Sequence, residues 1–257
     1  MSKNELKARL LAGDTVFGVW SMIASPVVAN VVATAGADFV VLDLEHGPMG
    51  LETVESQLYA IEACGSSPVV RMRNSPSAEI LNVLEIGTRS LMMSHVSTPD
   101  EATRIAAACR YAPDGDRGLS PFTRIHDYSE VGINEKLAKA NLEMLTGVLV
   151  EGDEGVKNLE EIASTPGVDL VYLGVYDLSM AAGVPGQVDH PDVIDLMKRS
   201  VEIIESAGAV AGSVARDVDY MEMLIRARFR FVAYRNDTTL LRNAVGEARS
   251  QFDRLVN

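Results

Sequence analysis

The chain has 257 residues, enough for one large α/β domain, and its hydrophobic fraction of 47% excludes an intrinsically disordered protein. Its formal net charge of -13 argues against non-specific nucleic-acid binding and gives an anionic substrate no long-range attraction. No apolar run approaches the roughly 18 residues that a membrane span needs, and the two cysteines, Cys64 and Cys109, have no metal-binding spacing. We therefore expect a cytoplasmic protein with reduced thiols that binds neither membranes nor nucleic acid.

Short apolar runs alternate with helical patterns along the whole chain. Runs this apolar are typical of strands that are buried on both faces of a parallel sheet. The predicted strands, in chain order, are 16–20, 39–44, 68–71, 90–96, 145–151, 169–177, 209–214 and 229–234. Such a series of strand–helix units without a Gly-x-Gly-x-x-Gly motif favours a closed (β/α)8 TIM barrel over an open sheet, with one domain over 1–257.

Two segments depart from this rhythm. The first, 111–141, is a long excursion rich in proline, glycine and charge before the fifth strand, and excursions of this length are usually functional. Its polar side chains, among them Arg117, Arg124 and His126, are expected at the surface. The second, 236–257, predicts a C-terminal helix.

Polar and aromatic residues gather where the predicted strands end. Barrel enzymes place their sites at the carboxyl ends of the strands, so these residues are the candidates for chemistry. They are Trp20, Asp43, Glu45, His46, Arg71, Ser94, His95, Glu151, Tyr176, Asp177, Ser213, Arg235 and Asp237. His95 follows apolar residues, and we interpret it as a partly buried packing residue.

Glu151 and Asp177 end neighbouring predicted strands, one strand–helix–strand unit apart. Their carboxylates should therefore lie at the same edge of the barrel. Two carboxylates, completed by water and substrate oxygens, are the usual protein contribution to a Mg²⁺ or Mn²⁺ site. The alternative is that each acid caps the helix that follows it.

His46 and Arg71 are the other candidate site residues. His46 follows Asp43 and Glu45, whose carboxylates could hold one imidazole tautomer, so it is either a general base or a solvated loop histidine. Arg71 ends an apolar strand, where a guanidinium must find an anion or reach water.

Five motifs along the chain, taken together, resemble those of the HpcH/HpaI family. This family comprises the metal-dependent class II pyruvate aldolases, which include 4-hydroxy-2-oxoheptanedioate and 2-keto-3-deoxyglucarate aldolases. The resemblance runs from Val16 to Leu241, nearly the whole chain. Each motif is weak alone, and their common order gives the resemblance its specificity. The motifs are Asp43-Leu-Glu-His-Gly-Pro, Val69-Val-Arg, Arg110-Tyr-Ala-Pro-Asp-Gly-Asp-Arg-Gly, Val150-Glu and Gly174-Val-Tyr-Asp-Leu-Ser.

The resemblance implies a barrel of the phosphoenolpyruvate/pyruvate-binding type that reversibly cleaves a 4-hydroxy-2-oxo acid to pyruvate and an aldehyde through a metal-stabilised pyruvate enolate. It implies Mg²⁺, Mn²⁺ or Co²⁺ at Glu151 and Asp177. It also implies a homo-oligomer, commonly a hexamer built as a trimer of dimers, with exchanged C-terminal helices.

The resemblance also assigns roles to individual residues. Arg71 would stabilise the pyruvate enolate, and His46 would act as acid and base, paired with the carboxylate of Glu85. The backbone at the sixth strand would bind the substrate carboxylate. With Arg71, the residues implied in substrate binding are Trp20, Gly174, Val175 and Tyr176.

The chain departs from the family pattern on the aldehyde side. Glu85 stands where aspartate is usual, Val175 replaces a proline, and Ser94-His95 replaces a proline followed by a hydrophobic residue. We therefore expect an aldolase with an unusual aldehyde. Two alternatives stay open: a CoA-ester lyase of the citrate-lyase-β type, although no basic cluster for CoA phosphates is evident, and a non-catalytic barrel that binds 2-keto acids.

Overall fold

The computed structural model describes residues 4–73 and 76–256, so the ends of the predicted domain lie outside the described residues. The described strands form a closed barrel in which each pairs in parallel with its neighbours in sequence, and the first pairs with the last. They are β1 (Val16–Ser21), β2 (Phe39–Asp43), β3 (Ser67–Met72), β4 (Ser90–Met93), β5 (Leu145–Val150), β6 (Leu170–Leu173), β7 (Val210–Ala215) and β8 (Phe231–Asn236). The predicted single-domain (β/α)8 TIM barrel is confirmed.

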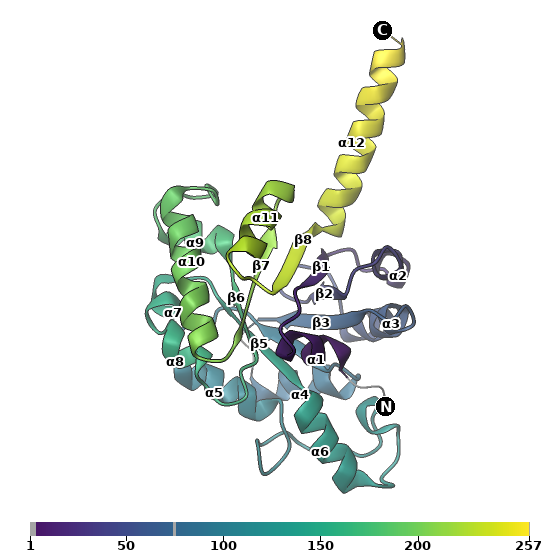
Figure 1. Cartoon of the computed structure of the whole chain (residues 1–257). Helices are drawn as coiled ribbons and strands as arrows, with labels where there is room; N and C mark the ends of the chain where they lie inside the picture. The colour runs from purple at the N-terminus through teal and green to yellow at the C-terminus, as the bar shows by residue number, and fades with distance from the viewer. Residues whose placement is uncertain (1–3, 74–75, 257) are drawn as a thin grey trace.

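Helices surround this barrel (Figure 1). None of the described helices is long and apolar enough to cross a membrane. They are α1 (Glu5–Leu11), α2 (Pro26–Thr34), α3 (Leu51–Glu62), α4 (Ser77–Glu85), α5 (Pro99–Ala108), the 3₁₀ helix η1 (Arg124–His126), α6 (Ile133–Glu143), α7 (Asp153–Lys157), α8 (Leu159–Ala163), α9 (Val175–Ala181), α10 (Pro191–Ser206), α11 (Val218–Arg226) and α12 (Asp237–Val256).

The barrel interior is filled by large side chains. Phe39 and Phe231 stack with their ring centroids 3.8 Å apart, and Tyr172 meets Phe231 edge-on at 6.1 Å. Gly18 leaves the space that the Phe39 ring occupies, because a Cβ atom at this position would collide with that ring. A second apolar cluster lies between the strands and the helices. The packed interior closes the barrel below the pocket described in the next subsection.

Two predicted strands end at least three residues earlier than the sequence indicates. β6 stops at Leu173, and Val175 begins α9, so Asp177 lies in the first turn of a helix rather than at a strand end. The apolar run continues across this boundary because the helix buries Val175 as well, which hides the change of period. β4 stops at Met93, and His95 has a left-handed backbone with φ 54°.

The excursion before β5 packs against the barrel. Arg117 and His126 are buried, which makes the expectation of surface positions wrong for both. The Tyr111 hydroxyl lies 2.8 Å from His126 Nε2, Arg117 stacks over the Tyr111 ring at 4.5 Å, and Arg117 Nη2 donates to Glu85 at 3.0 Å. We call Glu85, Tyr111, Arg117 and His126 the excursion cluster. Glu85 ends α4 shortly before β4 begins, so the cluster lies towards the amino-terminal edge of the barrel.

The last helix, α12, projects away from the barrel (Figure 1). Of its residues only Asp237 is buried. The exposed residues include large apolar side chains, namely Leu241, Val245, Phe252, Leu255 and Val256. The predicted C-terminal helix is present, and its exchange between copies stays a prediction.

Candidate functional site

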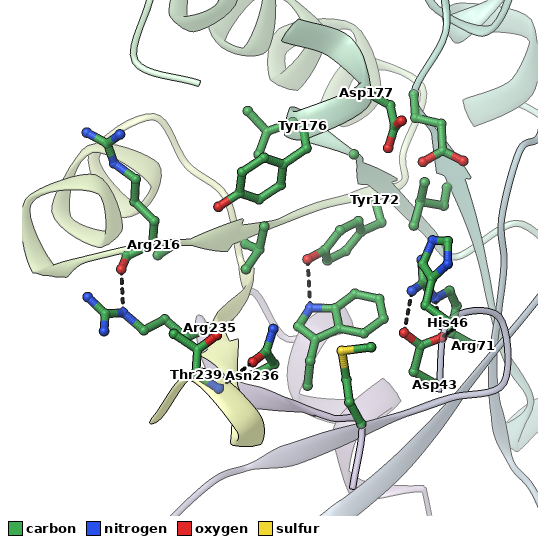
Figure 2. A pocket seen from close by; sticks show the side chains of 18 of the residues that line it. Asp43, His46, Arg71, Tyr172, Tyr176, Asp177, Arg216, Arg235, Asn236 and Thr239 are labelled. Atoms are coloured by element: carbon green, nitrogen blue, oxygen red, sulfur yellow. Dashed lines mark hydrogen bonds and ion pairs between the residues drawn. The ribbon is translucent and has the colours of Figure 1, made fainter. Parts of the chain in front are cut away.

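A pocket of about 510 Å³ opens at the carboxyl ends of the strands. Figure 2 shows the labelled side chains that line it, drawn from several strands and from the loops that follow them. Apart from Glu85, all the predicted site residues line this pocket: Trp20, His46, Arg71, Glu151, Gly174, Val175, Tyr176 and Asp177.

Arg71 is held rigidly at the end of β3. Its Nε–H and Nη2–H groups donate to the two oxygens of Asp43, at 2.9 and 2.5 Å, and Nη1 lies 2.8 Å from Glu45. The guanidinium also stacks over the Trp20 ring at 4.6 Å. A guanidinium carries five N–H donors, so donors remain on Nη1 and Nη2 for a substrate oxygen. The two acids and the ring therefore present a fixed cation to the pocket.

Asp43 also shapes the turn that carries His46. Its Oδ1 accepts the backbone N–H of Glu45 at 2.9 Å and of His46 at 3.1 Å, which is a typical side-chain-stabilised turn. The His46 side chain is 66% exposed, and its Nε2 lies 4.0 Å from Glu45. His46 is thus an exposed imidazole that lines the pocket, with one carboxylate beside it.

The pKa of Glu151 is raised to about 7. Burial is the largest cause, the charges of Asp177 and Glu45 also raise this pKa, and the charge and the backbone N–H of His95 lower it. A Cβ atom on Gly174 would come within 2.8 Å of Glu151, so glycine leaves the carboxylate room at this point. Crowded acids of this kind are stabilised by a cation.

The donor set fits a hard divalent cation. Glu151 and Asp177 offer carboxylate oxygens, the ligands that Mg²⁺ and Mn²⁺ prefer. Within 4–73 and 76–256, no group of three or more His, Cys, Asp or Glu side chains is arranged to hold a metal. A cation held here would therefore take its remaining ligands from water and substrate, which is common for Mg²⁺.

His95 belongs to the site, although the sequence indicated a packing role. Its Nδ1 lies 2.6 Å from Glu151 Oε1, and its Nε2 lies 3.0 Å from Glu45. Its backbone N–H donates to the same Glu151 oxygen at 3.0 Å. The side chain is 59% exposed, so the expected partial burial is wrong. The left-handed backbone after β4 turns the imidazole towards the acids, and no sequence signal marks that turn.

Glu85 is not brought to His46 within one chain. It pairs with Arg117 in the excursion cluster, and among the described residues its Oε2 is buried without a hydrogen-bond partner. The His46–Glu85 pair stays a prediction.

The wall of the pocket away from the acids was not singled out by the sequence. Figure 2 shows Arg216 and Arg235 on one side and Asp177 and His46 on the other, with Tyr176 between them. The Arg235 Nε–H donates to the backbone carbonyl of Arg216 at 2.5 Å. Arg235 stood among the strand-end residues, but its sequence position gave it no role.

Residues 16–244 match the model of the HpcH/HpaI aldolase/citrate lyase family. The chain belongs to this family. Named aldolases are similar to this chain over almost its full length. A hydroxypyruvate/pyruvate aldolase of Chromohalobacter salexigens is 36% identical to it over 98% of each chain. A 4-hydroxy-2-oxo-heptane-1,7-dioate aldolase of Shigella sonnei is 35% identical over 97% of this chain and 95% of its own.

Solved structures of the family agree with the fold. A HpcH/HpaI aldolase/citrate lyase family protein from Burkholderia cenocepacia superimposes with a TM-score of 0.91 and 32% identity, over 97% of this chain and 99% of its own. The predicted family is therefore confirmed, and the chain is an aldolase-type lyase of the pyruvate aldolases.

Proposed function

We propose that the protein is a divalent-metal-dependent aldolase that reversibly cleaves a 4-hydroxy-2-oxo acid to pyruvate and an aldehyde. The observation that carries the proposal is the meeting of Glu151 and Asp177 with Arg71 and His46 around one pocket. The names of the relatives support aldol chemistry on small keto acids.

Glu151 and Asp177 would hold Mg²⁺, Mn²⁺ or Co²⁺. When bound, the cation would supply a Lewis acid that lowers the cost of negative charge on the 2-oxo oxygen, by several kcal/mol in general. The raised pKa of Glu151 supports this role, since two crowded carboxylates are stabilised by a positive neighbour.

The chain's own residues account for the remaining steps. His46 would take the proton of the 4-hydroxyl group, the bond between C3 and C4 would break, and the electron pair would pass to the pyruvate fragment as its enolate. The free donors of Arg71 would stabilise that enolate, and a proton returned to C3 would give pyruvate. Trp20 and the 174–176 segment would line the substrate.

A pyruvate-release assay tests the proposal. Purified protein would be offered several 4-hydroxy-2-oxo acids after EDTA treatment, with and without added Mg²⁺, Mn²⁺ or Co²⁺. Release that depends on the cation supports the proposal. Cleavage of a CoA ester instead would support the citrate-lyase-β type of lyase, to which the family name also refers. Pyruvate binding without turnover of any substrate would support the non-catalytic barrel.

We also propose that the protein acts as a homo-oligomer, a hexamer built as a trimer of dimers. The exposed apolar residues of α12 have no cover within the chain, and a second copy would bury them. Glu85 lies towards the opposite edge of the barrel from the pocket, so it would reach His46 only from a neighbouring copy. Its unpartnered Oε2 supports this placement.

Mixed oligomers test the role of Glu85. Glu151→Gln and Glu85→Gln chains would be co-expressed and compared with each variant alone, and Glu160→Gln, at an exposed position of α8, is the control partner. Activity of the first mixture above that of both variants supports a site shared between copies. A fully active Glu85→Gln protein would remove Glu85 from the site, and light scattering reports the oligomeric state directly.

A further inference from the structure

The pocket carries two arginines on the wall opposite its acids, and they differ in how their charge is used (Figure 2). The Arg216 side chain is paired with Asp189 at 3.0 Å and Asp217 at 3.1 Å. Arg235 donates its Nε–H to the Arg216 carbonyl, but it forms no ion pair with any residue that the structure describes. The guanidinium also lies over the Tyr234 ring, 5.5 Å from its centroid. Arg235 therefore leaves its positive charge uncompensated on this wall.

The backbone of Arg235 gives a second, independent observation. Its φ is 54°, in the left-handed region that glycine adopts freely and that is unfavourable for a residue with a Cβ atom. A long charged side chain at such a position, at the edge of a pocket, is typical of a residue retained for function rather than for folding. The neighbouring lining residues, Asn236 and Thr239, are uncharged and add no carboxylate.

The charge of the remaining pocket defines what Arg235 would bind. The opposite wall holds the carboxylates of Asp43, Glu151 and Asp177. Its Arg71 is already paired with Asp43 and with the buried Glu45. An anionic group on the aldehyde end of a substrate would be repelled there, and the chain as a whole is acidic. Arg235 offers that group an unpaired guanidinium with terminal donors suited to a carboxylate or phosphate.

We infer that Arg235 is a specificity-determining residue, which binds an anionic group, a carboxylate or a phosphate, at the end of the substrate that becomes the aldehyde. The inference rests on the proposed function and deepens it, because it defines the class of aldehyde. Aldehydes with an anionic end are preferred to uncharged aldehydes of the same length.

A binding experiment tests the inference without turnover. Isothermal titration in the presence of Mg²⁺ compares 2-oxoheptanedioate with 2-oxoheptanoate, which differ only in the terminal carboxylate and lack the hydroxyl needed for cleavage. We expect the diacid to bind about tenfold more tightly, the value of one charge-assisted contact. Arg235→Gln should remove this preference, whereas Arg226→Gln, an exposed arginine paired with Glu222 away from the pocket, should keep it. Equal binding of the two acids by the wild type, or an unchanged preference in Arg235→Gln, overturns the inference.

Condensation of pyruvate with three aldehydes then shows whether Arg235 prefers a carboxylate or a phosphate. Succinic semialdehyde carries a carboxylate, glyceraldehyde 3-phosphate a phosphate, and butanal neither. We expect the ratio of kcat/KM for the preferred anionic aldehyde to that for butanal to fall about tenfold in Arg235→Gln. An unchanged ratio contradicts the inference. If the wild type condenses no aldehyde, the proposed function fails, while the titration still decides the role of Arg235.

Thermal unfolding gives a third measurement. Arg235→Gly removes the side chain and also relieves the left-handed backbone, so its Tm should rise while the preference for the diacid is lost. A lower Tm together with a retained preference would mean that Arg235 serves the fold and not the ligand.

Discussion

The pocket and the excursion cluster are built from the same kinds of residue, at opposite edges of one barrel. Each contains an arginine stacked on an aromatic ring, Arg71 over Trp20 at 4.6 Å and Arg117 over Tyr111 at 4.5 Å. Each arginine is bonded to a carboxylate. Each cluster also includes a histidine.

The two clusters differ in their balance of charge. In the excursion cluster, Arg117 is paired with Glu85. Burial, followed by the charge of Arg117, lowers the pKa of His126, which favours the neutral imidazole. In the pocket, several acids face Arg71, and burial raises the pKa of Glu151 to about 7. Within one chain, the balanced charges of the excursion cluster stabilise the fold, and the catalytic role proposed for Glu85 requires a neighbouring copy. In the pocket, an excess of negative charge is left for a ligand to compensate, which suits binding and chemistry.

Removing an acid from the pocket should give the largest effect. Glu151→Gln and Asp177→Asn should each lower kcat/KM for pyruvate release roughly a thousandfold, because either change removes charge that would hold the cation. The free energy of unfolding should change by less than about 1 kcal/mol, since these acids repel each other in the fold. Glu160→Gln is the surface control. Full activity in both variants would show that the acid excess has no catalytic purpose.

The same substitution in both clusters sharpens the contrast. Arg71→Lys keeps the charge but loses the fork that binds Asp43 and Glu45, so kcat/KM should fall roughly a hundredfold. Arg117→Lys should instead lower the free energy of unfolding by about 2 kcal/mol, because Glu85 and the Tyr111 ring lose a buried partner. Urea unfolding and steady-state kinetics on both variants measure the two effects. If Arg117→Lys lost more activity than Arg71→Lys, the division of roles would be reversed.

A pH dependence of stability should distinguish the excursion cluster. The folded state holds the pKa of His126 below the value of 6.5 that it has when unfolded, so below this pH the unfolded chain binds more protons. The contribution of the neutral His126 side chain to the free energy of unfolding is therefore complete above about pH 6.5. It is lost as the pH falls towards the pKa of His126 in the folded state. Between about pH 7.5 and pH 5.5, the free energy of unfolding measured with urea should fall less for His126→Gln than for the wild type. An equal loss in both proteins would contradict a neutral buried imidazole.

The barrel was predictable because its strands are short apolar runs at regular spacing. This pattern can be recognised in the sequence without any knowledge of tertiary contacts. The positions of Glu151, Asp177 and Arg71 at the pocket were predictable for the same reason, since each ends or follows such a run. The excursion was harder to interpret. Its prolines, glycines and charges resemble an exposed loop, but Arg117 and His126 are buried through contacts with α4 and Tyr111 that no local pattern encodes.

Backbone conformation accounts for the other features of the site that the sequence did not predict. His95 contacts Glu151, an acid of the pocket, and Arg235 lines the pocket itself. Both residues have a left-handed backbone, and neither is a glycine or asparagine that would signal such a turn. Asp177 was assigned to a strand because α9 buries Val175 and extends the apolar run. The sequence thus identified residues near strand ends and could not say which way the chain turns beyond them.

Trp20 is the single tryptophan of the chain, and it lies in the pocket beneath the Arg71 guanidinium with its indole N–H bonded to the Tyr172 hydroxyl at 3.0 Å. The intrinsic tryptophan fluorescence of the protein consequently reports on the environment of this pocket alone. Titrations of cations, keto acids and aldehydes can be followed by intrinsic fluorescence on the unlabelled protein, with no other indole to contribute background.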